Sequence, residues 1–343
     1  MLPISVLYWL VMTVRNWLFD KHVLPVTKLN VPVLSVGNIA AGGTGKTPLV
    51  EIVVRKLQAR GRKPAIVSRG YGRITRGYLL VSGEGTKIAS PRDAGDEAVQ
   101  MAENCAGSVV AVGENRVEAV KRVLSESSAD CIVVDDGFQH RYLHRDLNIV
   151  LMTAKELIGG DWMLPAGNRR ESMISIRRAD AVIISKCRDR RDYEIAKDKL
   201  PASAPRAIAA FRVVPRSLRN VSTGQCIDRH SARGLAVTTC SGIGDPDSFT
   251  RSVQEFGCTV VSKIEFPDHH WYSASDLNRM RIEVAERKAG LLVTTQKDSV
   301  RLRALETPFE DFCKQVPVCV LEVVPEFVAG EEMIDGLIGK VLA

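Results

Sequence analysis

Short apolar runs alternate with helical patterns over most of the chain. Runs rich in valine, isoleucine and leucine predict strands at residues 32–36, 64–68, 109–112, 131–134, 147–151 and 181–185. Several are apolar at almost every position, which is typical of strands covered on both faces. Helical patterns separate them, for example at 48–60, where Pro48 suits a first helical turn and Gly61 ends the helix. This alternation predicts an α/β fold with a mostly parallel sheet and helices on both faces.

The character of the sequence changes near residue 188. A highly charged stretch at 188–199 is followed by Pro201, Pro205 and Pro215, which we interpret as a connection between domains. Further strands are predicted at 235–239, 260–266, 291–295 and 318–323, with a helical pattern at 276–288. We therefore expect a larger domain over 31–200 and a smaller α/β domain over 201–343, whose C-terminal end could pack back on the first.

The first 30 residues form a separate feature. Residues 2–14 carry no charge, and the run is shorter than the 18 or so apolar residues that a spanning helix needs. It lacks the basic start and small-residue cleavage site of a secretory signal. Side chains that suit a lipid interface or lipid phosphates are Tyr8, Trp9, Trp17, Arg15, Lys21 and Lys28. Over 1–30 we expect an amphipathic helix at a membrane interface; the alternative is a helix packed on the core or on another subunit.

The composition and charge of the chain indicate which kinds of molecule it binds. The 343 residues are 45% hydrophobic and 25% charged, as in a soluble protein with a substantial core, and the net charge of +7 suits anionic partners. No recognised nucleic-acid module is present, so we expect no nucleic-acid partner. The 8 cysteines form no CxxC pair and no zinc spacing, which indicates free thiols in a reducing compartment.

A glycine-rich loop lies between the first predicted strand and the first predicted helix. Residues 37–48 read GNIAAGGTGKTP, which matches the P-loop pattern except that Ala40 replaces the first glycine. Backbone N–H groups of such a loop surround phosphate oxygens at a helix N-terminus. We expect Lys46 to reach the β- and γ-phosphates and the Thr47 hydroxyl to bind Mg²⁺. The predicted nucleotide-binding residues are Ala41, Gly42, Gly43, Thr44, Gly45, Lys46, Thr47 and Pro48.

An acidic pair completes the expected nucleotide site. Cys131 opens a run of apolar residues that ends in Asp135 and Asp136, which is the Walker B arrangement of a buried strand with carboxylates at its tip. We expect Asp135 or Asp136 to bind Mg²⁺ directly or through water, together with Thr47.

A P-loop does not by itself distinguish a kinase from a GTPase or an ATPase. GTPases read guanine with a lysine and an aspartate two residues apart, but Arg188 stands two residues after Lys186, and 295–298 also lacks this spacing.

A kinase needs an acceptor hydroxyl and often a carboxylate that receives its proton. Polar candidates that follow predicted strands or open helices are Ser68, Arg69, Asp96, Glu97, Glu114 and Arg116.

Several longer stretches resemble one family, tetraacyldisaccharide 4'-kinase, also called lipid A 4'-kinase. The matching stretches are SVGNIAAGGTGKTP (35–48), SRGYGR (68–73), GDE (95–97), VVDDGFQHRYLHRDLNIVL (133–151), LPAGNRRES (164–172), GIGDPDSF (242–249), FPDHHWY (266–272) and TTQKD (294–298). They follow the family's order over nearly the whole chain, and DDGFQHR is far more specific than the P-loop.

The resemblance implies a reaction and a location. ATP would donate its γ-phosphate to the 4'-hydroxyl of a tetraacylated glucosamine disaccharide 1-phosphate and give lipid IVA. The enzyme would be peripheral, on the cytoplasmic face of a bacterial inner membrane, with ATP and Mg²⁺ as cofactors. Its partners would be the lipid disaccharide and the membrane surface, and no protein partner is implied.

Residue roles also follow from the matched motifs. Asp96 would accept the proton of the acceptor hydroxyl, and a histidine from the second domain would pair with it. The sequence leaves His269 and His270 open, with a slight preference for His269. Lys46 would complete the catalytic set. Contacts to phosphate or substrate are expected from Ser68, Arg69, Arg116, Gln139, His140, Arg170 and Glu171.

The chain departs from the family pattern at a few positions. Asn168, Arg169 and Ser172 are atypical, Thr153 stands where an aspartate is expected, and Gln296 replaces a glutamate. These departures affect substrate contacts and leave the nucleotide motifs intact. Alternative functions are a membrane-associated P-loop ATPase acting as a switch or assembly factor, a GTPase, and a noncatalytic nucleotide-binding module.

Overall fold

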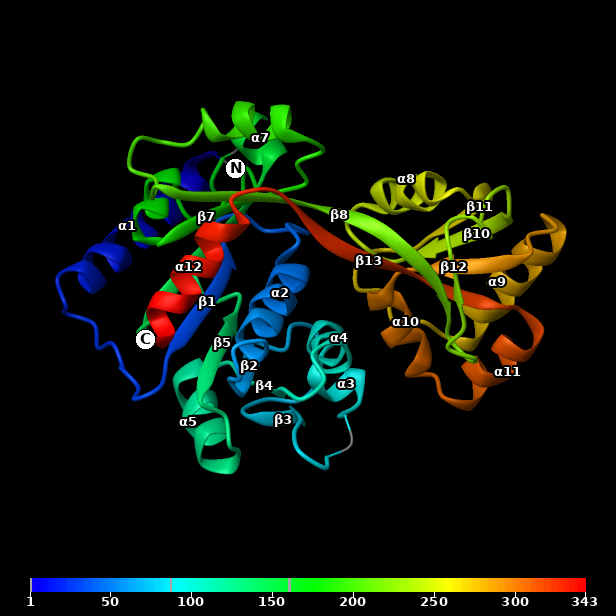
Figure 1. The fold of residues 1–343 in the computed structure, drawn as a ribbon, viewed down its shortest axis with the longest axis horizontal. Helices are drawn as coiled ribbons and strands as arrows, with labels where there is room; N and C mark the ends of the chain where they lie inside the picture. Colours follow the sequence, from blue (N-terminus) through cyan, green and yellow to red (C-terminus); the bar gives the residue numbers. More distant parts are fainter. Residues whose placement is uncertain (1, 87, 160–161) are drawn as a thin grey trace.

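A computed structural model describes residues 2–86, 88–159 and 162–343. Its strands form one 13-stranded sheet in the order β11-β10-β12-β13-β8-β7-β6-β1-β5-β2-β4-β3, with β9 paired to β8. Figure 1 shows two groups of helices and strands, joined by the long strands β8 and β13. The expected α/β fold with a mostly parallel sheet is therefore confirmed.

The P-loop half of the sheet comprises strands β1 to β7. Its parallel strands are β1 (Val33–Asn38), β2 (Pro64–Ser68), β4 (Val109–Val112), β5 (Cys131–Asp135), β6 (Leu147–Thr153) and β7 (Ala181–Ser185), and β3 (Leu79–Ser82) pairs antiparallel with β4. Alternate strand residues enter different cores, because Leu34 faces one apolar cluster and Val33 another. Helices thus cover both faces of this half.

The helices of this half divide between those two faces. The Leu34 face packs against α2 (Lys46–Gln58) and α4 (Asp96–Asn104), while the Val33 face packs against α5 (Arg116–Glu126). Smaller elements complete this half: α3 (Pro91–Ala94), α6 (Ala154–Gly159), the 3₁₀ helix η1 (Met173–Arg178) and α7 (Arg190–Lys197). The N-terminal ends of α2 and α4 lie at the edge where the parallel strands end, because the P-loop joins β1 to α2 and Gly95 lies against Tyr71, which follows β2.

The second half is a smaller parallel sheet. It contains β10 (Ala236–Ser241), β11 (Thr259–Glu265) and β12 (Leu291–Thr294), with helices α8 (Pro246–Phe256), α9 (Ala274–Glu286), α10 (Gln296–Arg303) and α11 (Thr307–Gln315). These strands lie where the sequence predicts them. Helix α10 faces the P-loop half and packs against α4.

A long antiparallel ribbon connects the halves. It pairs β8 (Ala207–Asn220) with β13 (Val318–Ala329), and the short β9 (Cys226–Ile227) joins β8. Pro215, which the sequence analysis places in the connection between domains, lies inside β8. It pairs with Val323 beside a register shift, an irregularity of the kind that tolerates proline in a sheet.

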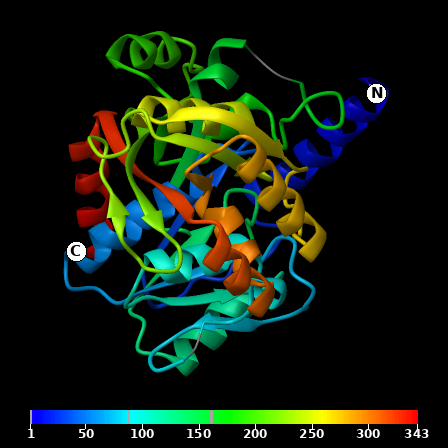
Figure 2. The same cartoon turned by 90° about the vertical axis from the view of Figure 1, so that its right-hand side faces the viewer.

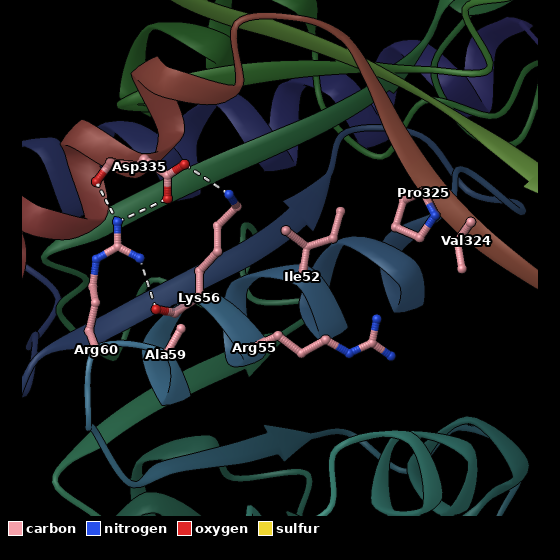
Figure 3. Close-up of a pocket in the computed structure, with 8 residues that line it drawn as sticks. All are labelled: Ile52, Arg55, Lys56, Ala59, Arg60, Val324, Pro325 and Asp335. Carbon is pink, nitrogen blue, oxygen red and sulfur yellow. Dashed lines mark hydrogen bonds and ion pairs between the residues drawn. The ribbon is translucent and has the colours of Figure 1, made fainter.

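The C-terminal helix α12 (Glu331–Leu342) packs on the P-loop half. Ile334 and Ile338 are fully buried in the same cluster as α2. Lys56 on α2 and Arg60, which follows α2, form ion pairs with Asp335, as Figure 3 shows, beside a cavity of about 410 Å³. None of the residues that line this cavity belongs to the predicted site.

The N-terminal helix α1 (Leu2–Asp20) is largely exposed. It is long and apolar enough to cross a membrane by length and composition, and only 11% of its most apolar window is buried. In Figure 2 the two termini lie on opposite sides of the molecule. Helix α1 therefore offers an apolar surface that the described protein does not cover.

Candidate active site

The P-loop connects β1 to α2. Gly42 and Gly45 have φ values of 114° and 90°, which side chains with a Cβ rarely adopt. Thr44 is held from two sides, because the Asn38 amide donates to its Oγ1 at 3.1 Å and Ser185 Oγ donates to its carbonyl at 2.6 Å. Lys46 then begins α2, so the loop has the backbone turn and the helix N-terminus that phosphate binding requires.

The acidic pair follows β5 beside this loop. Asp135 is the last residue of β5 and accepts a hydrogen bond from Ser68 Oγ at 2.8 Å. Asp136 lies 3.6 Å from Lys46 Nζ and 2.8 Å from the Arg170 guanidinium. Asp136 has a left-handed φ of 51°, a costly conformation that is common at functional sites. The structure brings Lys46, Asp136 and Arg170 together, although they are far apart in the sequence.

The two carboxyls differ in their electrostatics. Burial raises the pKa of Asp135 to about 6, and the negative charges of Glu97 and Asp136 add to this effect. Burial also acts to raise the pKa of Asp136, but Lys46 and Arg170 hold it below its ordinary value. Asp135 is therefore a buried carboxyl whose pKa the charge of Lys46 lowers too little to offset burial.

These residues fit a magnesium ion. The Oδ1 atoms of Asp135 and Asp136 are buried and have no hydrogen-bond partner within the described chain. Over 2–86, 88–159 and 162–343, no group of three or more His, Cys, Asp or Glu could hold a metal alone. Mg²⁺ is commonly bound by one or two carboxylates together with substrate phosphates and waters, which is the donor set available here.

The predicted substrate residues are distributed around this edge. Arg116 begins α5 and is 6% exposed, with Nη1 donating to the Glu114 carbonyl at 3.0 Å. The Arg116 charge acts on Asp136, whereas Arg69 is exposed. Gln139 donates its side-chain amide to the Asn38 carbonyl at 2.7 Å, which ties the DDGFQHR segment to β1.

His140 is a neutral group at this edge. Burial and the charges of Arg116, Arg145 and Arg15 lower the pKa of His140 to about 4. A cavity of about 420 Å³ lies beside it, lined by Pro25, Thr27, Asn115, Val117, His140 and Tyr142. The imidazole can therefore act as a hydrogen-bonding group without carrying a charge at neutral pH.

Helix α1 holds the segment that carries Arg170 and Glu171. Tyr8 donates its hydroxyl to the Arg170 carbonyl at 3.1 Å, and Asn16 donates to the Glu171 carboxylate at 2.7 Å. Arg15 donates to the Gln139 carbonyl at 2.7 Å. The polar side of α1 thus contacts the site, a link for which the sequence offered no signal.

Asp96 lies at the N-terminus of α4 and is 3% exposed. Gly95 precedes it with a φ of 91°, and a Cβ there would lie 2.8 Å from the Tyr71 carbonyl, so glycine allows this close approach. Asp96 Oδ2 is 3.3 Å from His269 Nδ1, which belongs to the second half of the sheet. Burial acts to raise the pKa of Asp96, but His269, Lys297 and Arg301 together hold it below its ordinary value.

The structure separates the two histidines that the sequence left open. His269 faces Asp96, and its backbone has a left-handed φ of 59°. His270 instead lies 3.1 Å from Asp276 and stacks on Phe266 at 4.6 Å. The partner of Asp96 is therefore His269, and His270 belongs to the packing of the second half.

Two cations on α10 were not predicted. Lys297 Nζ lies 2.9 Å from Glu97 Oε1 and 3.3 Å from His269 Nε2. Arg301 is fully buried, with Nε 3.5 Å from Asp96 Oδ2 and Nη2 bonded to Asp298. The only sequence signal was the matched stretch TTQKD, which contains Lys297 but assigns it no role.

Known proteins of one family match nearly the whole chain. A family model described as Tetraacyldisaccharide-1-P 4'-kinase matches residues 1–342. A protein from Chlorobium luteolum named tetraacyldisaccharide 4'-kinase is 38% identical over 346 residues, which cover 99% of this chain and 96% of that protein. A protein of the same name from Bdellovibrio bacteriovorus is 37% identical over 303 residues, covering 88% of this chain and 89% of that protein.

A solved structure has the same fold. The crystal structure of LpxK from Aquifex aeolicus, described as an apo form in complex with ATP, superposes with a TM-score of 0.79 at 32% identity. The match covers 100% of this chain and 98% of that chain.

Proposed function

The chain belongs to the tetraacyldisaccharide 4'-kinase family, and from this premise we propose how its residues carry out the transfer. The protein is an ATP-dependent kinase that phosphorylates the 4'-hydroxyl of a tetraacylated disaccharide in lipid A biosynthesis. A P-loop ATPase acting as a switch is not favoured, because the matched family and relatives are named as kinases of this disaccharide.

We assign ATP to the P-loop, with its γ-phosphate between Lys46 and the acidic pair. Lys46 and Arg170 supply positive charge where the transferred phosphoryl group passes. Thr47, Asp135 and Asp136 would hold Mg²⁺, which when bound neutralises phosphate charge. Gln139 fixes the acidic loop against β1, and Arg116 lies close enough for its charge to act on Asp136.

We assign the acceptor sugar to the space in front of Asp96. Asp96 accepts the proton of the 4'-hydroxyl as that oxygen attacks the γ-phosphate. His269, whose Nδ1 lies 3.3 Å from Asp96 Oδ2, would orient that carboxylate. The observation that supports this role best is a buried carboxylate from the P-loop half that meets a histidine from the second half, next to the residues of the nucleotide site.

The two halves of the sheet provide the two partners of this pair. We propose that 31–200 act as the kinase domain and 201–343 as the smaller domain. Because Asp96 and His269 lie on different domains, movement of one domain relative to the other would open and close the acceptor site.

We propose that the protein binds the cytoplasmic face of the inner membrane through α1. Exposed apolar side chains on this helix include Leu7, Trp9, Leu10 and Trp17, while its polar side contacts the site. The acyl chains of the substrate would remain in the membrane while the disaccharide enters beside His140. This arrangement would place the 4'-hydroxyl at the edge of the sheet that carries Asp96.

The proposed function is tested by transfer to the lipid. Purified protein in detergent receives ATP, Mg²⁺ and the tetraacylated disaccharide 1-phosphate, and mass spectrometry identifies the product. The expected product gains one phosphate on the 4'-oxygen. A folded, full-length preparation that binds ATP but transfers no phosphate to this acceptor would refute the assignment.

A further inference from the structure

Lys297 on α10 contacts two neighbours of Asp96, which are the adjacent residue Glu97 and the paired histidine His269. Its ammonium lies 2.9 Å from Glu97 and 3.3 Å from His269 Nε2. His269 Nδ1, the other ring nitrogen, lies 3.3 Å from Asp96 Oδ2. The imidazole therefore has a carboxylate on one nitrogen and an ammonium on the other.

This placement restricts where the imidazole proton can be. A lysine ammonium only donates hydrogen bonds, so a ring nitrogen that bonds to it must offer a lone pair. A neutral imidazole has one donor and one acceptor nitrogen, and the partners of each nitrogen decide which is which. If Nε2 accepts from Lys297, the proton lies on Nδ1, the ring nitrogen that is 3.3 Å from Asp96 Oδ2.

The other groups that face His269 favour the same arrangement. A proton on Nε2 would face the ammonium, and the nearest acceptor is Asp268 Oδ1 at 3.9 Å, beyond hydrogen-bonding distance. The Tyr71 ring lies 5.0 Å from the imidazole, centroid to centroid, on the remaining side. Burial acts to lower the pKa of Lys297, but Glu97 and Asp96 hold it above its ordinary value, so Lys297 stays charged.

We propose that Lys297 is a positioning residue that fixes His269 in the Nδ1–H tautomer. The proposal rests on the function assigned to Asp96 above. An Nδ1–H tautomer supplies Asp96 with a neutral donor, which orients the carboxylate without removing as much of its basicity as an imidazolium would. Lys297 would thereby act on the proton acceptor through His269 and not by contact with the substrate.

The tautomer can be measured directly, without any substrate. The chain has 6 histidines, so ¹⁵N-histidine labelling gives few ring signals, and His269→Gln identifies those of His269. In the unaltered protein at neutral pH we expect a protonated Nδ1 and an unprotonated Nε2. A dominant Nε2–H tautomer or a doubly protonated ring would overturn the proposal.

Substitutions test the cause. Lys297→Met keeps the length of the side chain without its charge, and we expect it to shift His269 toward a protonated Nε2. Lys297→Arg, which still only donates, should retain the Nδ1–H tautomer. Arg303→Met is the matched control, because Arg303 pairs with Glu103 across the same α4–α10 contact at 2.8 Å but does not contact His269.

Enzyme kinetics distinguish a positioning role of Lys297 from a role in packing alone. We expect Lys297→Met to lower kcat about tenfold with little change in the KM for ATP, and to move the acid limb of the pH–rate profile to higher pH. Lys297→Arg should recover most of the rate, and Arg303→Met should resemble the unaltered enzyme. An unchanged His269 ring signal in Lys297→Met would refute the proposal. Absence of lipid phosphorylation by the unaltered protein would instead refute the proposed function.

Discussion

The nucleotide side and the acceptor side of the site are built in different ways. On the nucleotide side, Lys46, Asp135 and Asp136 come from strands and a helix of the P-loop half, next to one another in the sheet. On the acceptor side, Asp96 on α4 meets His269 and Arg301 from the second half, and Lys297 of the same half contacts His269. The first side is complete within one half, whereas the second forms only where the halves meet.

The contrast extends to charge. On the nucleotide side, Asp135 is a buried carboxyl without a cation at hydrogen-bond distance, so charge there is left for a metal to balance. On the acceptor side, the Asp96 carboxylate faces one histidine and two cations and is balanced within the protein. The two sides should therefore respond differently to loss of a carboxylate, to pH and to relative movement of the halves.

Loss of the Asp96 carboxylate should have the largest effect. Asp96→Asn keeps the size of the side chain but cannot accept the acceptor proton in the same way, so we expect kcat to fall by about 10²–10⁴-fold. ATP binding, measured by calorimetry, should be retained, because Lys46 and the acidic pair Asp135 and Asp136 are unaltered. Glu103→Gln on the same helix is the control. A kcat within a few-fold of the unaltered enzyme would remove Asp96 from the mechanism.

Substitution of Asp135 and of Asp136 by asparagine should change the free energy of unfolding in opposite directions. Because burial raises the pKa of Asp135 to about 6, the fold favours its protonated form, and this stabilisation is lost as pH rises from about 4 to above 6. Asp135→Asn should therefore raise the free energy of unfolding of the nucleotide-free protein at pH 8 by about 2–3 kcal/mol. It should also abolish most kinase activity.

The matched variant is Asp136→Asn. The pKa of Asp136 is held below its ordinary value, so its carboxylate stabilises the fold at neutral pH, and the effect is lost only as pH falls toward that low value. Asp136→Asn should lower the stability at pH 8. Thermal unfolding in EDTA without nucleotide measures both variants, and changes of the same sign would contradict the electrostatic contrast.

The same division explains what could be predicted from the sequence. The P-loop and the acidic pair are local patterns, because strand, turn and helix signals specify where their side chains lie. The buried strands β1 to β7 were readable for the same reason, apart from the short β3. Resemblance supplied the role of Asp96 and the histidine pair, with only a slight preference for His269 over His270.

Contacts between residues that are far apart in the sequence could not be predicted. Arg301 reaches Asp96, and Lys297 reaches Glu97 and His269, because the ribbon of β8 and β13 carries α10 against α4. A single sequence does not encode that approach in any local pattern. Strand β8 was not predicted from the sequence, because Pro215 is interpreted there as part of a connection between domains. The contacts of Asn16 with Glu171 and of Arg15 with Gln139 also join segments more than a hundred residues apart.

Loss of the His269 side chain should lower kcat more than loss of the His270 side chain, but less than loss of the Asp96 carboxylate. His269→Ala removes the donor to Asp96, so we expect kcat to fall about 10–50-fold, as for loss of one orienting hydrogen bond. His270→Ala should leave kcat near normal and instead lower Tm, because His270 pairs with Asp276 and stacks on Phe266. Steady-state kinetics and thermal unfolding of both variants check this, and a larger kcat loss for His270→Ala would reverse the assignment.

The smallest expected effect concerns the outward side of α1. The Trp9 side chain is 44% exposed, so transfer of its exposed part into a lipid interface would contribute about 1 kcal/mol. Trp9→Ser should weaken binding to vesicles of anionic phospholipid roughly fivefold, measured by co-sedimentation, and leave kcat in detergent unchanged. Ile282→Ser on α9, where the isoleucine is exposed to the same extent of 44%, is the matched control and should bind vesicles normally. Equal losses for both variants would mean that α1 is not the membrane-binding surface. The acceptor side, which needs both halves, would then have to receive its lipid from another direction.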